Sequence, residues 1–301
     1  MIMKSININK SPFTLFGQIK WDPYHKIMTN RTVAISLFTL AVLASMAIMA
    51  PLIAPYDPNA IELKVCLQSP SVHHLLGTDH LGRDVFSRLL FGAATSFSIA
   101  FSVVSFALIM GIALGGAAGY FGGVYDDIIS RIIDIFLSFP SMIFALAIVG
   151  ALGSSVLNLV LALALVHWAS YARLMRGQVL SVKNNDYVSS ARVIGAGDKR
   201  ILIKHILPNA IAPVIVLATL DMGHVILSAA ALSYLGLGIP PYIPEWGSML
   251  NAGKEFMRTA PYLTLFPGMA ITLTAVLFSL LGDGFREVLD PESEVSGLGT
   301  T

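Results

Sequence analysis

Residues 94–118, ATSFSIAFSVVSFALIMGIALGGAA, form a long apolar run without a charged side chain. At a rise of about 1.5 Å per residue, such a run can cross a hydrocarbon core of about 30 Å as a single helix. Five further stretches qualify or nearly do, at residues 32–54, 128–150, 155–174, 209–235 and 263–283. The sequence therefore predicts an all-α, polytopic membrane protein with six transmembrane helices.

The composition of the chain agrees with a membrane location. Of its 301 residues, 55% are hydrophobic and 12% are charged, whereas a soluble domain carries about 25% charged residues. A net charge of +1 gives no reason to expect a nucleic-acid partner, which calls for a concentrated basic face. The single cysteine, Cys66, excludes an internal disulfide and a metal site built from cysteines.

The predicted third span is interrupted by polar residues and a proline. Arg131, Asp134 and Pro140 lie within or beside its apolar positions. We expect Arg131 to extend towards the cytoplasmic interface, and Asp134 to turn inward rather than face lipid.

The distribution of basic residues predicts the orientation. Of the 19 Lys and Arg residues, 14 fall on the side that holds the amino terminus and the loop between the fourth and fifth spans. The positive-inside rule then places both termini in the cytoplasm. The first 31 residues lack the apolar run of a cleaved signal peptide, so we expect the first span to be an uncleaved anchor.

Two outer segments are long enough to have structure of their own, residues 55–93 and 236–262. The second contains clustered Pro and Gly, which oppose a regular helix, and we expect it to cap the outer mouth of a cavity. No internal repeat is visible. The predicted organisation is a cytoplasmic tail (1–31), the first helix with its outer loop (32–93), a five-helix core (94–285) and a second cytoplasmic tail (286–301).

The loop between the fourth and fifth spans, residues 184–209, reads NNDYVSSARVIGAGDKRILIKHILPN. A first short helix is predicted from about Asp186 to Ile194, with Asp186 as its N-cap. Gly195 or Gly197 would then supply the positive φ of a tight stop.

A second short helix is predicted to start at Asp198, as its N-cap, and to end before Pro208. The unit has a basic side, and its partial apolar face comprises Val188, Ala191, Ile194, Ile201, Leu202 and Ile206. Such a unit can bind a groove on a protein partner or the anionic inner leaflet. It can also be a connector without a partner, and the pattern alone leaves these three alternatives open.

The spacing in this loop resembles the EAA loop of ABC importer permeases: Glu-Ala-Ala, three residues, Gly, nine residues, then Ile-x-Leu-Pro. Ser189 stands in the place of the glutamate, Gly195 in the glycine place, and His205 in the place of the terminal Ile. The resemblance implies a loop that couples the permease to an ATPase through Asp186, Tyr187, Ser189, Ser190, Ala191, Gly195, Ala196, His205, Leu207 and Pro208.

Further resemblance covers nearly the whole chain and points to one branch, the C-type permease subunit of dipeptide, oligopeptide and nickel importers. One departure is Ala229, where many relatives carry Glu. The five ordered blocks are HLLGTDHLGRDVFSRLLFGAATS (74–96), AGYFGGVYDDIISRIIDIFLSFP (118–140), YARLMRGQVLSVKNNDYV (171–188), LSYLGLGIPPYIPEWGSML (232–250) and LLGDGFREVLDP (280–291).

This resemblance implies a type I ABC importer transmembrane domain in the bacterial cytoplasmic membrane. It implies four protein partners: a homologous B-type permease subunit, two ABC ATPase subunits that use ATP and Mg, and an external solute-binding protein. Peptides rank first as the solute, and nickel or a metal chelate second. The chain lacks the G-x-x-x-x-G-K-[ST] phosphate loop, and we predict neither a catalytic residue nor a bound cofactor in it.

Two ionisable residues lie three positions apart in the predicted fifth span, Asp221 and His224. Placing a charge at the membrane centre costs about 2.5–3.5 kcal/mol, so they should face a cavity or each other. They are candidates for lining the solute path, and the alternative is a mutually satisfied pair that packs two helices. Asn158 and His167 in the fourth span are interpreted as interhelical hydrogen-bonding groups.

Other functional readings make distinct demands. His73, His74 and His80 cluster in the first outer loop, but no carboxylate stands at clear ligand spacing, so we expect no metal site. A secondary transporter or channel could use Asp134, Asp221 and His224 as an ion relay, but it calls for pseudo-symmetric halves that the sequence does not show. If the chain were a membrane scaffold that only recruits a partner, its deletion would leave solute uptake intact.

Overall fold

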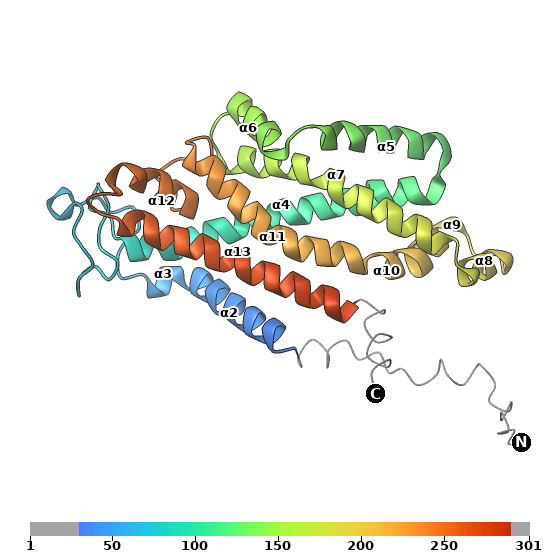
Figure 1. Cartoon of the computed structure of the whole chain (residues 1–301), viewed down its shortest axis with the longest axis horizontal. Helices are drawn as coiled ribbons and strands as arrows, with labels where there is room; N and C mark the ends of the chain where they lie inside the picture. Colours follow the sequence, from blue (N-terminus) through green and yellow to red (C-terminus); the bar gives the residue numbers. More distant parts are fainter. Residues whose placement is uncertain (1–29, 290–301) are drawn as a thin grey trace, which may run out of the picture.

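The computed structural model describes residues 30–289, so most of the predicted amino-terminal tail and residues 290–301 of the predicted carboxy-terminal tail lie outside the described part. Long helices run side by side along the longest axis of the molecule (Figure 1). Five of the described helices are long and apolar enough to cross a membrane: α2 (Arg31–Ile48), α4 (Val85–Phe121), α7 (Val156–Lys183), α11 (Ala212–Tyr234) and α13 (Tyr262–Leu289).

The predicted single third span is wrong in one respect. Helix α5 (Gly123–Ser138) and helix α6 (Ser141–Leu152) together have the length of one span, but they are bent by 88° at their junction. Phe139 is extended there, with φ −91° and ψ 141°. Pro140 follows it, and a proline both lacks an N–H and pushes the preceding residue out of helical geometry. With this pair counted as one span, the six-span prediction is confirmed.

Asp134 does not turn into the helix bundle as expected. Its carboxylate accepts a hydrogen bond of 2.5 Å from Arg173 of α7, and its side chain is 68% exposed. Arg173 on the neighbouring helix α7 therefore pairs with this charge, and the carboxylate does not have to be buried.

Two helices extend well beyond the predicted spans. Helix α4 begins at Val85 because Asp84 caps it, with a carboxylate oxygen that accepts from the backbone N–H of Ser87. Helix α7 continues to Lys183, so it carries the apolar bundle directly into the basic loop. These extensions exceed the predicted spans because hydropathy marks the lipid-facing part of a helix and not its ends.

Glycines allow α4 and α7 to pack closely. A Cβ atom built on Gly111 would lie 2.3 Å from Cβ of Tyr171, and one on Gly115 would lie 2.2 Å from the carbonyl oxygen of Ala172. Small residues at this spacing let two helix backbones approach each other within a membrane. The position of α7, and of the loop that follows it, therefore depends on this stripe.

Replacing Gly115 by Val is expected to destabilise the protein by about 1–3 kcal/mol, the usual cost of overpacking. Thermal unfolding of the purified protein in detergent measures the change. Gly150→Val is a matched control, because a Cβ on Gly150 of α6 meets nothing within 4 Å. Equal melting temperatures for the two variants would contradict this packing.

The start of α2 and the end of α13 lie at the same end of the bundle (Figure 1). The side-chain amide of Asn30, which caps α2, donates to Glu287 at 3.0 Å. A Cβ on Gly284 would lie 2.0 Å from Cγ2 of Val33. The first and last described helices therefore contact each other at the end where the chain enters and leaves.

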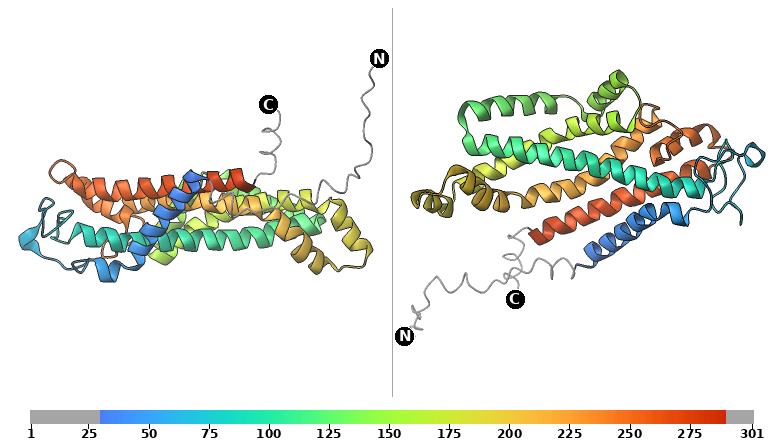
Figure 2. Two further views of the ribbon diagram at one scale, coloured as in Figure 1. Left: turned by 90° about the horizontal axis from the view of Figure 1, so that it is seen from below. Right: turned by 180° about the vertical axis from the view of Figure 1, so that it is seen from behind.

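At the opposite end, the two outer segments pack together (Figure 2). The Pro- and Gly-rich residues before Glu245 are not helical, as predicted, and the short helix α12 (Trp246–Gly253) follows them. Tyr262 donates from its hydroxyl to the carbonyl oxygens of Gln68 and Thr78, at 2.8 and 3.0 Å. The outer segments thus form one packed cap and not two separate loops.

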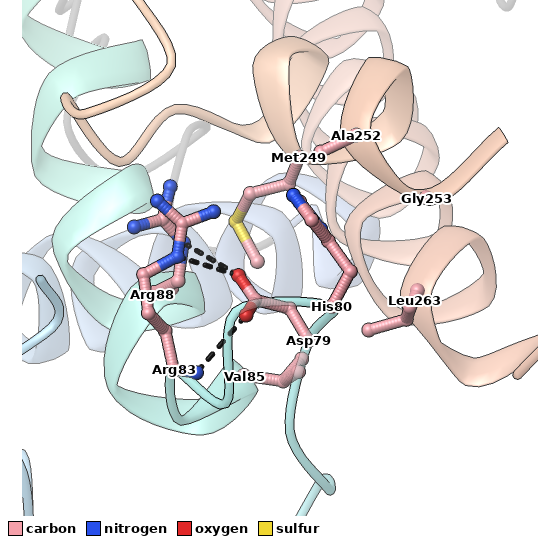
Figure 3. A pocket seen from close by; sticks show the side chains of 9 residues that line it. All are labelled: Asp79, His80, Arg83, Val85, Arg88, Met249, Ala252, Gly253 and Leu263. Atoms are coloured by element: carbon pink, nitrogen blue, oxygen red, sulfur yellow. Dashed lines mark hydrogen bonds and ion pairs between the residues drawn. The ribbon is translucent and has the colours of Figure 1, made fainter. Parts of the chain in front are cut away.

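A buried ion cluster fixes this cap (Figure 3). Arg83 donates to the carboxylate of Asp79 at 2.7 Å, and the guanidinium of Arg88 lies 3.9 Å from the same oxygen. Both guanidinium groups also donate to the carbonyl oxygen of Pro241, at 3.4 and 3.2 Å. The cluster joins the first outer segment to the second, and the cavity beside it, of about 20 Å³, is large enough to hold a water molecule.

Glu245 is a second buried carboxylate in the cap. It accepts hydrogen bonds from the backbone N–H groups of Gly247 and Ser248, both at 2.8 Å, and so caps α12. Burial raises the pKa of Glu245, and the hydrogen bonds to its carboxylate act in the opposite direction. Its role is to hold α12 against α4 and α11, which α12 contacts.

Candidate functional site

Residues 184–209 form a compact unit at the end of the bundle opposite α12 (Figure 1). It consists of α8 (Asp186–Val193), a turn, α9 (Asp198–Ile201), one π-helical turn η3 (Leu202–Ile206) and α10 (Leu207–Ala210). The predicted arrangement of a helix, a turn and a second helical segment is therefore present.

The turn after α8 contains the positive φ that the sequence predicts. Gly195 has φ +84°, whereas Gly197 has φ −70° and belongs to the ordinary extended region. The backbone N–H of Gly195 donates to the carbonyl oxygen of Arg192 at 3.0 Å, and that of Ala196 donates to the carbonyl oxygen of Ala191 at 3.1 Å. This pair of bonds is the Schellman motif, which satisfies the last carbonyls of a helix.

Both predicted N-caps are wrong. Asn185 and Gly197 occupy the cap positions, without a side-chain cap bond, and Asp186 and Asp198 are the first helical residues. An acidic residue in the first turn still interacts favourably with the helix dipole. The carboxylate of Asp198 accepts instead from the hydroxyl of Tyr120, at 2.6 Å.

Pro208 does not end the second helix as predicted. It lies in the first turn of α10, where a missing N–H leaves no helical bond unmade. The N–H of Leu207 bonds to the carbonyl of Leu202, five residues back, so the wider π-turn accommodates the proline. The carbonyl of His205 is satisfied by the side-chain amide of Asn209 at 2.7 Å.

The unit buries one apolar face and leaves an apolar tip exposed. Val188, Ala191 and Ile206 are buried, as the predicted face requires. Ile194, which was predicted on that face, is 85% exposed, and Val193 beside it is 87% exposed. Of the other predicted coupling residues, Ala196, His205 and Leu207 are partly buried, and the exposed ones are Asp186, Tyr187, Ser189, Ser190, Gly195 and Pro208.

Asp221 in α11 is held by two side chains of α7 and not by His224. Its Oδ2 lies 2.8 Å from Nδ1 of His167 and accepts from the hydroxyl of Tyr171 at 3.0 Å. Nδ1 of His224 lies 3.9 Å from Oδ1, beyond hydrogen-bond distance. His167 thus makes the interhelical bond predicted for it.

Asp221 and His224 both line a hollow of about 560 Å³, which we call the α7–α11 hollow. Its walls also include the aromatic rings of Phe136 and Phe139 and the hydroxyls of Ser141, Ser170 and Ser228. The His224 side chain is 68% exposed, whereas that of Asp221 is 11% exposed. The two candidate residues therefore share one space, with Asp221 in its wall and His224 projecting from it.

The comparisons with known proteins agree on one family. The family model described as binding-protein-dependent transport system inner membrane component matches residues 107–295. The chain belongs to this family. A second model, the N-terminal transmembrane domain of oligopeptide transport permease C, matches residues 21–70. The chain is therefore a multi-pass inner-membrane permease subunit of an ABC importer.

Relatives with different printed solutes resemble the permease over most of its length. A dipeptide transport permease of Alkalihalophilus pseudofirmus is 41% identical over 90% of this chain and 89% of its own. A nickel transport permease of Escherichia coli is 40% identical over 86% and 94%, respectively. A glutathione transport permease of Pectobacterium atrosepticum is 42% identical over 90% and 91%.

Solved structures support the fold. A methionine ABC transporter in an inward-facing conformation has a TM-score of 0.55 with 19% identity, covering 67% of this chain and 97% of that chain. An amino acid ABC transporter gives 0.54 with 16% identity, covering 68% and 95%. The predicted ABC importer transmembrane fold is confirmed.

The permease ties residues 184–209 to the two long helices α4 and α7 through Tyr120, a residue that the sequence analysis missed. Besides the bond from Tyr120 to Asp198, the ammonium of Lys183 in α7 donates to the carbonyl of Tyr120 at 2.5 Å. Its Nζ also lies 5.5 Å from the centre of the Tyr120 ring. Since Asp198 lies 78 residues away along the chain, no local pattern could have indicated this contact.

Two of the remaining polar residues, Asn158 and His74, have partners in the permease, whereas Nδ1 of His80 is buried without one in the described part of the chain. The Asn158 side chain donates to the carbonyls of Leu152 and Gly153, at 2.9 and 3.0 Å, and so joins the end of α6 to α7. Nδ1 of His74 lies 2.9 Å from Asp84, the N-cap of α4. Between residues 30 and 289, no group of three or more His, Cys, Asp or Glu residues is arranged to hold a metal ion.

Proposed function

We propose that residues 184–209 dock on a cytoplasmic ATPase and transmit its motion to the transmembrane helices. In this proposal the chain pairs with a homologous permease subunit, two ATPase subunits bind beneath the pair, and an external binding protein delivers the solute. Both termini are cytoplasmic. The chain itself contributes no catalytic residue and binds no cofactor, and its partners hydrolyse ATP with Mg.

The observation that carries this proposal is the exposed apolar tip of a unit that buries its other apolar residues Val188, Ala191 and Ile206. Val193 ends α8 and Ile194 follows it before the turn at Gly195, and both are exposed. Lys199 and Arg200 of α9 are exposed as well. A rigid helix that presents apolar side chains is suited to a groove on a protein partner. The unit is linked to α4 and α7 through the contacts of Tyr120 with Asp198 and Lys183, so a force on the tip would reach both helices.

The orientation can be tested by cysteine labelling in whole cells. Cys66 is first replaced by Ser, and then either Lys199 or Tyr242 is replaced by Cys. A membrane-impermeant maleimide is expected to label Tyr242→Cys in intact cells, and Lys199→Cys only after permeabilisation. Labelling of Lys199→Cys in intact cells would place residues 184–209 outside the cytoplasm and contradict the proposed orientation.

For the solute, we propose a peptide first and nickel or a metal chelate second. The relatives' printed names include dipeptide, glutathione and nickel transport. The test is to purify the complex with its binding protein and to identify the bound solute by mass spectrometry. Recovery of a metal without a peptide would reverse the order.

Tyr120→Phe is expected to reduce the uptake per ATP hydrolysed by roughly two- to tenfold, because a hydrogen bond is worth about 0.5–1.5 kcal/mol. The variant removes one hydroxyl, so membrane insertion should be normal. Uptake and ATP hydrolysis are measured together in proteoliposomes. Tyr125→Phe is the matched control, since Tyr125 is 61% exposed; equal coupling ratios for both variants would exclude a transmitting role for Tyr120.

A further inference from the structure

The carboxylate of Asp221 lines the α7–α11 hollow, and only one of its two oxygens makes hydrogen bonds. Both hydrogen bonds to Asp221, from Tyr171 and with His167, involve Oδ2. Oδ1 has no hydrogen-bond partner among the described residues. It is also not one of their buried polar atoms that lack a partner, so it is not fully buried. A carboxylate oxygen in this state can accept a donor that enters the hollow.

The walls of the hollow favour a cation of modest size. Asp221 is its one acidic residue, and no Lys or Arg is among the described residues that line it. The hydroxyls of Ser170 and Ser228 supply further acceptors, and the aromatic rings of Phe136 and Phe139 line the hollow without adding a charge. The volume of about 560 Å³ is in the range of small-molecule sites.

The acceptor groups in the hollow fit an ammonium group better than a metal ion. Nδ1 of His167 is already engaged with Oδ2, and Nδ1 of His224 is 3.9 Å from Oδ1. No group of three metal-ligating side chains is formed among the described residues. One carboxylate oxygen with nearby hydroxyls is instead what a protonated primary amine needs, because an ammonium donates up to three hydrogen bonds.

We propose that Oδ1 of Asp221 binds the protonated amino terminus of a peptide as it passes through the α7–α11 hollow. His167 and Tyr171 are positioning residues that hold the carboxylate from α7. His224 lies on the same side as Oδ1 and forms part of the wall. The proposal deepens the proposed function and rests on it, since it assumes that the hollow belongs to the solute path.

The test uses the complete transporter in proteoliposomes, with Cys66→Ser and Ser170→Cys in this chain. Ser170 lines the hollow and is exposed, so its thiol reports on the space. A neutral methanethiosulfonate reagent labels the thiol in the presence of dialanine amide, which carries one ammonium, or of N-acetyl-dialanine amide, which carries none. Dialanine amide is expected to protect at concentrations at least tenfold lower, and Asp221→Asn is expected to abolish this difference.

A second measurement does not depend on peptide affinity. The rates of labelling by a cationic trimethylammonium reagent and by an anionic sulfonate reagent are compared at the same thiol. Asp221→Asn is expected to lower the ratio of the cationic to the anionic rate by roughly tenfold, since a unit charge in the wall is lost. Ser228→Cys repeats the test from α11 in case Ser170→Cys is poorly folded.

Three results would overturn the inference. They are equal protection by the two peptides, an unchanged rate ratio in Asp221→Asn, and protection by nickel chloride alone where dialanine amide has no effect. ATP-dependent uptake in the same vesicles separates the two proposals. Uptake that needs ATP without an amine preference removes only the amine site, whereas uptake without ATP removes the proposed function.

Discussion

Replacing Gly195 by Val is expected to weaken association with the ATPase subunits by roughly 5- to 150-fold, the range that corresponds to about 1–3 kcal/mol of backbone strain. Gly195 has φ +84°, and an added Cβ meets nothing within 4 Å. The cost therefore comes from the backbone conformation and not from crowding. A β-branched residue would leave the left-handed region, break the Schellman bonds and redirect α9.

Two matched variants isolate this effect. Gly197→Val introduces the same side chain two residues away, where φ is −70° and space is also open, and it should bind the ATPases much more tightly than Gly195→Val. Gly195→Asn should recover part of the affinity, because Asn tolerates positive φ. Co-purification from membranes measures association, with membrane abundance as the control. Full binding and transport by Gly195→Val would contradict the role of the turn.

Asp221→Asn is expected to reduce uptake by roughly 10- to 100-fold, since a hydrogen bond to a charged group is worth about 1.5–3 kcal/mol. The amide keeps the shape of the carboxylate and one acceptor oxygen, so the contact with α7 persists in part. What is lost is the charge in the wall of the α7–α11 hollow. Initial uptake rates, divided by the amount of protein in the membrane, measure the change.

Asp134→Asn is the matched control for this substitution. Its carboxylate also pairs with a side chain of α7, but it is 68% exposed and lies outside the hollow. Exposed ion pairs contribute about 0–1 kcal/mol, so uptake should stay within a few-fold of the parent protein. Unchanged uptake in Asp221→Asn would assign that residue to helix packing alone.

The apolar runs were sufficient to predict the membrane fold, because lipid demands long, uninterrupted helices. The α5–α6 bend could have been predicted from Pro140, which the sequence analysis noted without drawing the consequence. Inward burial of Asp134 was wrong because its partner, Arg173, lies on another helix and meets its charge at the surface.

Residues 184–209 show what local sequence can and cannot predict. A positive φ at Gly195 or Gly197 follows from chain chemistry, since a tight stop after a helix calls for it, and the structure assigns it to Gly195. The caps at Asp186 and Asp198 were misplaced by one residue, and Pro208 was misread because a π-turn precedes it. The contacts of Tyr120 with Asp198 and of His167 with Asp221 depend on helix packing, which spacing along the chain does not reveal.

In the proposed function, the apolar tip of residues 184–209, Val193 and Ile194, contacts the ATPase. The most direct measurement places a photo-crosslinking amino acid at Val193, in the assembled transporter, and identifies the crosslinked protein by mass spectrometry. Val72, which is 93% exposed in the first outer segment, is the control position. We predict crosslinks to the ATPase from Val193 and none from Val72. The absence of crosslinks from Val193 to the ATPase, or equal crosslinking from both positions, would contradict this contact.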